Sequence, residues 1–216
     1  MELSFLNLKD TRKTDDAQLW VVGCSFAHGH GLGNINSRFG QVLADKLNLP
    51  VSFLTQSGTS IAWAADQILR SDIKKDDVVV WALTGASRLT FLDDNNILHH
   101  IGVGNYNEFP VVGNFINKNF LVSNHMLYES FTHICQVTNY LNKIGAKFIL
   151  AVMPLNGQEH DLQTIAFTET IKNSVVLFDQ NDYSFIDLGM DQLHPGPLHH
   201  QWYADQIYSK FKNLYT

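Results

Sequence analysis

The sequence predicts a three-layer α/β/α fold around a parallel sheet. Short apolar runs suited to buried strands alternate with longer segments whose apolar residues recur at helical spacing. Their order is strand, helix, strand, helix, strand, an insertion, and then helix, strand, helix, strand, helix. This alternation is typical of a parallel sheet covered by helices on both faces. We therefore expect residues 1–216 to form a single domain, with an irregular, Asn-rich insertion at about 85–124.

The strands are predicted where short apolar runs end at glycine, proline or a polar turn. Gly23 ends the first run, Pro154 ends the fourth, and the charged segment 74–77 precedes the third. Two segments compete for the fifth strand. The predicted strands are 18–24, 51–55, 78–84, 147–153, and either 174–178 or 183–188.

The helices are predicted from apolar residues that share one face at a period of 3.6 residues. Ser60 can cap the second helix, because a serine hydroxyl accepts a hydrogen bond from a free N–H of the first helical turn. The segment 25–35, rich in glycine, histidine and asparagine, is instead expected to be a loop. The predicted helices are 37–48, 61–71, 125–143, 161–172 and 197–213.

The overall charge argues against two classes of partner. Lys and Arg total 15 against 21 Asp and Glu, which gives a net charge of −6. Neither nucleic acid nor an anionic membrane is therefore expected as the main partner. No apolar run approaches the roughly 18 residues of a membrane-spanning helix, and the first residues lack the pattern of a secretion signal. With only two cysteines, Cys24 and Cys135, we expect a cytoplasmic location.

The first of two predicted loops that can carry chemistry contains Ser25. This residue directly follows the first predicted strand, within the sequence GCSFAHGHG. In a parallel sheet such a residue lies at the carboxyl edge, where active sites are built. Its hydroxyl becomes a good nucleophile only when a base removes the proton. The alternative is a serine that caps the following turn.

The last predicted loop supplies a candidate base. Asp191 and His194 are three residues apart, a spacing that on a turn brings the carboxylate to one imidazole nitrogen while the other nitrogen faces a reacting group. Pro195 and Pro197 stiffen this segment ahead of the final helix. The alternative is an Asp-His pair that only caps that helix.

Together these blocks resemble the SGNH/GDSL hydrolase family. GCSFAHGHG resembles the family's nucleophile block, SGTS at 57–60 its glycine block, and DQLHP at 191–195 its C-terminal DxxH block. The resemblance covers about 18–213 and implies a flavodoxin-like sheet. It also implies a serine hydrolase that needs no metal or organic cofactor.

The resemblance implies a role for each block. Ser25 would be the nucleophile, His194 the general base and then acid, and Asp191 the group that orients the imidazole. The backbone N–H groups of Ser25 and Gly58 would donate to the oxyanion. The family's third block usually reads GxND after the third strand, and its Asn completes the oxyanion hole.

The third block of this chain departs from that pattern, because TGASR occupies 84–88. Ser87 falls at the position of the Asn, so either Ser87, Thr84 or Asn105 donates in its place or the activity is low. Loss of one oxyanion donor typically costs about 10²–10³ in rate.

Arg88 stands at the position of the family's Asp. It can bind a substrate carboxylate or phosphate through two parallel hydrogen bonds, or it can form an ion pair with Asp93 or Asp94. Of these two roles we favour the ion pair. Cys24, where the family motif has an acid, is expected to be a small apolar filler rather than a second nucleophile.

The histidines of the two loops offer a competing, metal-based interpretation. His199 and His200 are adjacent in the predicted final helix, where their side chains point about 100° apart, which does not favour binding of one metal ion by both. We therefore interpret His28 and His30 as polar residues of a substrate-binding cleft and expect no metal. The histidines that with Asp191 could in principle hold zinc or iron are His28, His30, His194, His199 and His200.

Three functions therefore compete, while the oligomeric state stays open. The first is an esterase or acyl/acetyl hydrolase that acts on a small-molecule or carbohydrate ester with a Ser-His-Asp triad. The second is a catalytically weak or inactive binding protein of the same fold, suggested by the altered third block. The third is a metal-dependent hydrolase that uses the histidine-rich loops.

Overall fold

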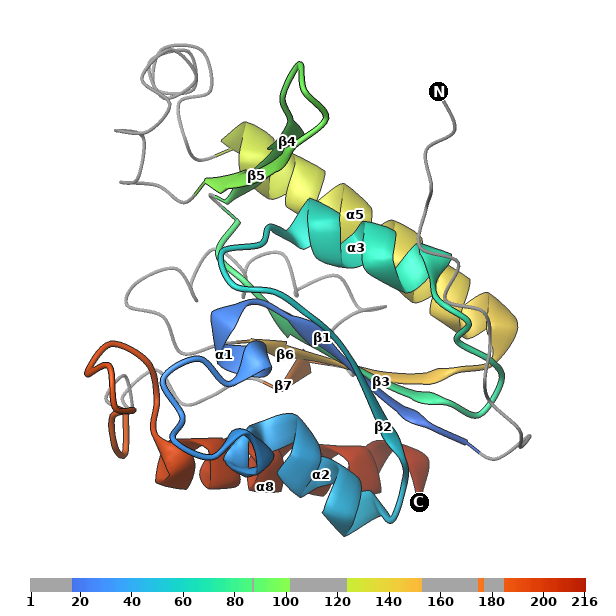
Figure 1. Cartoon of the computed structure of the whole chain (residues 1–216). Coiled ribbons are helices and arrows are strands. Elements are labelled where there is room, and N and C mark those ends of the chain that lie inside the picture. Colours follow the sequence, from blue (N-terminus) through green and yellow to red (C-terminus); the bar gives the residue numbers. More distant parts are fainter. Residues whose placement is uncertain (1–16, 87, 102–123, 153–174, 177–184) are drawn as a thin grey trace.

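A five-stranded parallel sheet forms the centre of the molecule (Figure 1). The computed structural model describes residues 17–86, 88–101, 124–152, 175–176 and 185–216. Along the sheet the strand order is β2-β1-β3-β6-β7, and every neighbouring pair is parallel. The strands are β1 (Leu19–Gly23), β2 (Val51–Thr55), β3 (Val78–Leu83), β6 (Lys147–Val152) and β7 (Val175–Val176).

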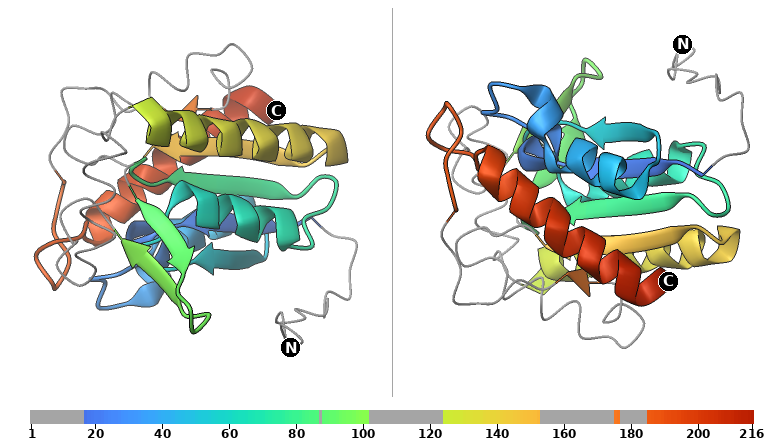
Figure 2. Two further views of the ribbon diagram at one scale, coloured as in Figure 1. Left: turned by 90° about the horizontal axis from the view of Figure 1, so that it is seen from above. Right: turned by 90° about the horizontal axis from the view of Figure 1, so that it is seen from below.

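Helices cover both faces of this sheet. Figure 2 shows α3 and α5 side by side over one face, and α2 and α8 over the opposite face. The predicted three-layer α/β/α architecture is therefore confirmed. The four helices are α2 (Phe39–Leu47), α3 (Ile61–Arg70), α5 (Asn124–Ile144) and α8 (Pro197–Tyr215). None of the described helices is long and apolar enough to cross a membrane.

The central strand β3 supplies side chains to two separate cores. Successive side chains of a strand point to opposite faces, and all six residues of β3 are buried. Val79, Trp81 and Leu83 pack with the core under α3 and α5. The alternate residues Val78 and Val80 pack with the core under α2 and α8, as does Ala82. This burial on both faces explains why the segment reads as a continuous apolar run.

An antiparallel hairpin follows β3. Its strands are β4 (Leu89–Leu92) and β5 (Leu98–Ile101), which fall at the start of the predicted insertion. His100 joins the hairpin to the loop after β2, because its Nδ1 lies 2.9 Å from Thr90 Oγ1 and its Nε2 lies 3.0 Å from Gln56 Nε2. The rest of the insertion, at 102–123, lies outside the described residues.

The bounds of most predicted helices and strands are confirmed to within one or two residues. The predicted cap of α3 is confirmed too, because the Ser60 hydroxyl accepts a hydrogen bond from Trp63 N at 3.2 Å. The loop predicted at 25–35 is wrong at its start, where the chain turns directly into the short helix α1 (Ser25–His28). A 3₁₀ turn, η1 (Ile35–Ser37), follows. The fifth strand is the first of the two alternatives, and the helix predicted at 161–172 lies outside the described residues.

Candidate active site

Ser25 lies at the carboxyl end of β1, where the strand gives way to α1. It is the first residue of that helical turn and is only 8% exposed. The first N–H groups of a helix have no intrahelical acceptor, so the Ser25 N–H is directed away from the turn's own carbonyls. Its carbonyl accepts hydrogen bonds from Gly29 N and His30 N, which closes the turn. Ser25 therefore lies at the edge of the sheet where parallel α/β folds build their active sites.

His194 and Asp191 form a tight pair in the turn before α8. His194 Nδ1 lies 2.6 Å from Asp191 Oδ2. Asp191 Oδ1 accepts two backbone hydrogen bonds, from Leu193 N at 3.1 Å and His194 N at 3.0 Å. These N–H donors, and then the His194 side chain, hold the pKa of the Asp191 carboxyl well below its usual range. An ionised Asp191 accepts a hydrogen bond from Nδ1–H of His194, and in that tautomer the free lone pair of the ring is on Nε2.

The two distant loops meet at Gly31. Met190 N donates to Gly31 O at 2.8 Å. Gly31 has φ +83°, and a Cβ at this position would lie 2.7 Å from Asp191 Oδ1. Gly189 packs on the same carbonyl, where a Cβ would lie 2.7 Å from Gly31 O. Two glycines thus allow the segment that follows Ser25 to pack closely against the Asp191 turn.

His30, five residues after Ser25, lies next to the Asp191–His194 pair. Its ring centroid lies 4.8 Å from that of His194, and its Nε2 lies 4.0 Å from Asp191 Oδ2. On its other side, His30 Nδ1 lies 3.4 Å from Ser57 Oγ. Ser25 itself contacts Cys24 Sγ through its hydroxyl, at 4.0 Å. Within the described residues, that hydroxyl makes no hydrogen bond with the His194 ring.

The capping role considered for Asp191 belongs to another carboxylate. Asp187 Oδ2 accepts from Leu198 N at 3.1 Å, and Asp187 Oδ1 accepts from His199 N at 2.8 Å. Both donors are in the first turn of α8, so Asp187 satisfies the free N–H groups of that helix. Gly196 leaves the room for this approach, since a Cβ there would collide with the carboxylate. The Asp191–His194 pair is therefore not needed as a helix cap.

The loop after β2 is tied to the end of β1, next to Ser25. Gln56 N donates to Gly23 O at 3.2 Å, and Gly58 adopts φ +82° in the same turn. Thr84 follows β3 at the same edge of the sheet. Its hydroxyl is buried and has no hydrogen-bond partner in the described part of the chain. Ser87, predicted as an oxyanion donor, lies outside the described residues.

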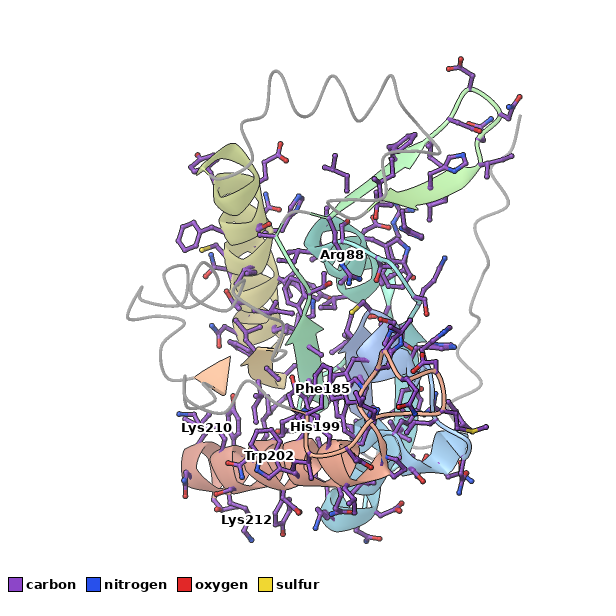
Figure 3. All side chains as sticks on the ribbon, turned by 90° about the vertical axis from the view of Figure 1, so that its left-hand side faces the viewer. Arg88, Phe185, His199, Trp202, Lys210 and Lys212 are labelled. Atoms are coloured by element: carbon purple, nitrogen blue, oxygen red, sulfur yellow. The ribbon has the colours of Figure 1, made fainter. Side chains whose placement is uncertain are left out.

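Arg88 does not form the ion pair that we favoured. Asp93 instead contacts His99, whose Nε2 lies 3.0 Å from Asp93 Oδ2. Asp93 Oδ1 accepts a hydrogen bond from Ile97 N at 2.8 Å. Within the described residues Arg88 has no acidic partner, and its Nη1 is buried without a hydrogen-bond partner. Asp93 lies in the turn of the hairpin directly after β4, and His99 lies on β5, so the closure of the hairpin brings the two side chains together. In Figure 3, Arg88 lies near the base of the hairpin, at the edge that also carries α1.

A pocket of about 120 Å³ lies beside Arg88. It is bounded by the first residues of α3, by Thr90 of the hairpin and by Ser130 of α5. Glu129 and His133 also line it, and Glu129 is exposed, so water screens its charge. The pocket therefore combines a buried guanidinium nitrogen with hydroxyl groups and apolar walls.

His28 lies at the rim of the same edge. It is exposed, and its Nδ1 lies 3.3 Å from Thr55 Oγ1 at the end of β2. Cys24 is fully buried in the core under α2 and α8, which confirms the interpretation as an apolar filler. Among the described residues, one group of potential metal ligands comes together, formed by His30, Asp191 and His194. His199 and His200, also considered as ligands, are buried and lie outside this group.

His200 has a structural role that the sequence did not reveal. Its Nδ1 accepts a hydrogen bond from Phe39 N, the first N–H of α2, at 3.0 Å. Its ring stacks on Phe26, with 4.4 Å between ring centroids. Burial lowers the pKa of His200 to about 3, because a charged imidazole would lose its hydration there. A neutral His200 thus caps α2 and packs against Phe26 of α1, next to Ser25 in the chain.

Known structures share this fold, although sequence comparisons find no relative. No protein-family profile matches the chain, and no curated protein matches it in sequence. A structure from Desulfitobacterium hafniense DCB-2, assigned to the G-D-S-L family of lipolytic proteins, is 14% identical, with a TM-score of 0.58. The match covers 90% of this chain and 99% of that one.

Two esterases give similar matches. A carbohydrate esterase family 2 enzyme with a carbohydrate-binding domain, from Corynascus thermopiles (Myceliophthora fergusii), is 16% identical with a TM-score of 0.58, over 94% of this chain and 68% of that one. The esterase EstA from Pseudoalteromonas sp., inhibited by monoethylphosphonate, is 13% identical with a TM-score of 0.53, over 92% and 98%. The chain therefore has the fold of SGNH/GDSL hydrolases, and the resemblance seen in its sequence is confirmed at the level of the fold.

The low pKa of His200 predicts that acid destabilises the protein. The unfolded chain takes up a proton at His200 near pH 6.5, whereas the folded chain does so only near its pKa of about 3. Stability from this residue is thus fully present above about pH 6.5 and decreases as the pH falls, by about 2 kcal/mol between pH 7 and pH 5. Urea denaturation at several pH values measures this slope. His200→Asn, which keeps an acceptor but does not titrate, should have a shallower slope, and an equal slope would contradict the assignment.

Proposed function

We propose that this protein is a serine esterase that hydrolyses an acyl or acetyl ester of a small molecule or carbohydrate. The observation that carries the proposal is the Asp191–His194 pair, with its 2.6 Å contact, docked against the loop that begins at Ser25. The fold shared with lipolytic proteins and esterases supports it. Acyl transfer by a serine needs a histidine that is oriented by a carboxylate, and the Asp191–His194 pair supplies that part of the arrangement.

In the proposed mechanism, His194 transfers one proton in each of the two half-reactions, acylation and deacylation. Nε2 of His194 takes the proton of the Ser25 hydroxyl as Oγ attacks the ester carbonyl, and Asp191 stabilises the imidazolium through Nδ1. The tetrahedral intermediate collapses, and the leaving alcohol takes that proton from Nε2. Water then gives a proton to Nε2 as it attacks the acyl-serine, and Ser25 recovers the proton when the acid leaves.

The oxyanion is proposed to receive hydrogen bonds from the N–H groups of Ser25 and Gly58. Ser87 was expected as the third donor, and it remains a candidate. Thr84 has a stronger argument in its favour, because its buried hydroxyl has no partner among the described residues and follows the strand adjacent to β1. A buried donor without a partner is costly unless a ligand satisfies it.

Arg88 is proposed to bind an anionic group on the substrate. Its guanidinium nitrogen is buried beside the 120 Å³ pocket and has no acidic partner in the described part of the chain. A carboxylate or phosphate would satisfy it with charge-assisted hydrogen bonds. His28 and His30 are proposed as polar residues at the mouth of the site, both on the nucleophile loop.

The triad predicts a loss of covalent labelling and turnover in matched variants. Wild type should react with a fluorophosphonate probe and hydrolyse a short-chain chromogenic ester, and Ser25→Ala should abolish both. Asp191→Asn should lower kcat by up to about 10⁴, because the wrong tautomer of His194 then prevails. The control is Asp187→Asn, which weakens the cap of α8. It should lower the free energy of unfolding and should lower kcat far less than Asp191→Asn does. Absence of labelling and of turnover over a broad ester panel would contradict the proposal and leave a ligand-binding protein of this fold.

The oxyanion assignment predicts a specific cost for removing one hydroxyl. Thr84→Val keeps the volume and deletes the donor, so kcat should fall by about 10²–10³ with little change in KM. Thr84→Ser, which restores the hydroxyl, should recover most of the rate. Steady-state kinetics of the three proteins measures the effect. A Thr84→Val rate within about twofold of wild type would exclude this donor role.

The Arg88 assignment predicts a change in selectivity. A neutral short-chain ester is compared with an analogue whose acyl chain ends in a carboxylate. The ratio of kcat/KM for the anionic over the neutral ester should fall by about 10- to 100-fold in Arg88→Met, because a charged hydrogen bond contributes about 1.5–3 kcal/mol. Arg88→Lys should retain part of the ratio. An unchanged ratio in Arg88→Met would overturn the proposed subsite.

A further inference from the structure

We propose that His30, Asp191 and His194 form a binding site for zinc or a similar divalent transition-metal ion, and that an ion bound there blocks the catalytic base. Each residue offers one ligand atom, and the three atoms lie within 4.8 Å of one another. Two imidazoles and a carboxylate are a donor set that zinc prefers. The binding claim stands on geometry alone, whereas the blocking claim rests on the proposed esterase function.

The spacing of the ligand atoms is close to that of a tetrahedral site. Zinc–ligand bonds of about 2.0–2.1 Å put neighbouring ligand atoms about 3.3 Å apart. Asp191 Oδ2 lies 2.6 Å from His194 Nδ1 and 4.0 Å from His30 Nε2. One separation therefore has to widen and the other to shorten, each by about 0.7 Å, which small rotations of side chains achieve. Water can complete the coordination, since half of the His30 side chain is exposed.

The surrounding hydrogen bonds orient these ligands without using the ligand atoms. His30 Nδ1 contacts Ser57 Oγ at 3.4 Å, which directs Nε2 toward Asp191. Asp191 Oδ1 is held by the N–H groups of Leu193 and His194, so Oδ2 is the oxygen that would bind an ion, in exchange for its 2.6 Å contact with His194 Nδ1. Such outer contacts to ligating histidines and carboxylates are typical of zinc sites in proteins.

Coordination would remove the base whichever nitrogen of His194 binds. A neutral imidazole has one proton and one free lone pair. If the ion takes Nδ1, the proton of that nitrogen moves through solvent to Nε2, which then has no lone pair to accept the Ser25 proton. If the ion takes Nε2, the lone pair is used directly. The net charge of the ring is unchanged in both cases, and proton transfer from Ser25 stops.

A calorimetric titration tests the binding claim. Chelator-treated full-length protein is titrated with zinc chloride at pH 7, and one ion per chain is expected to bind. Loss of an outer-shell partner already costs about 10–100-fold in metal affinity, so loss of the His30 ligand in His30→Ala should cost at least as much. His99→Ala is the matched control, because His99 also contacts an aspartate, Asp93, at 3.0 Å, yet is not part of the three-ligand group. It should bind zinc with an affinity within about twofold of wild type.

Ester turnover measured over the same zinc range tests the blocking claim. The rate should fall along the calorimetric occupancy curve, and a chelator should restore it. Failure to bind one ion, or equal affinities of wild type and His30→Ala, would overturn the site. A rate that rises with zinc would overturn the blocking role and support metal-dependent hydrolysis. A protein with no turnover at any zinc concentration refutes the esterase proposal, while calorimetry still decides whether the site exists.

Discussion

The contact between the Gly31 carbonyl and the 189–191 turn is the constraint on which the site depends. Met190 N donates to that carbonyl at 2.8 Å, and Asp191 lies where a side chain at position 31 would otherwise sit. Gly31 follows the turn in which Gly29 N and His30 N donate to Ser25 O, so the contact at Gly31 brings the Asp191 turn to the segment that carries the serine. The same contact fixes the carboxylate that orients His194. A candidate site composed of residues 166 positions apart in the chain, Ser25 and Asp191, is thereby held together by two short turns.

The polar groups that cap the helices near this contact are different from those that form the Asp191–His194 pair. Asp187 caps α8, and His200 caps α2, so neither helix needs the Asp191 carboxylate as an N-cap. Asp191 can therefore give one oxygen to backbone N–H groups and the other to His194. The groups that cap the helices and the groups of the candidate site are thus separate.

The fold was predictable from the sequence because its elements have strong local signals. Val78–Leu83 is apolar throughout because β3 is buried on both faces, and Ser60 is a serine because α3 needs a cap. The turn α1 was missed because four helical residues are too few to show a period. The order of the strands in the sheet has no such local signature, and follows from the packing of whole elements.

The site was predictable only in part. The Asp191–His194 pair was visible because its spacing is local, and its geometry agrees with the expectation. The contact of His30 with that pair, the cap formed by His200, and the partner of Asp93 all depend on residues that are distant in sequence or on the register of a hairpin. A sequence shows which side chains are present, but the packing of two glycines against a turn decides which of them meet.

The most direct test of the central claim is a crystal structure of the protein after reaction with an alkyl phosphonate. The account predicts phosphorus bonded to Ser25 Oγ, with His194 Nε2 hydrogen-bonded to that oxygen and Asp191 still in contact with Nδ1. A phosphonate attached elsewhere, or a His194 ring that remains out of hydrogen-bonding reach of the modified Ser25, would contradict it.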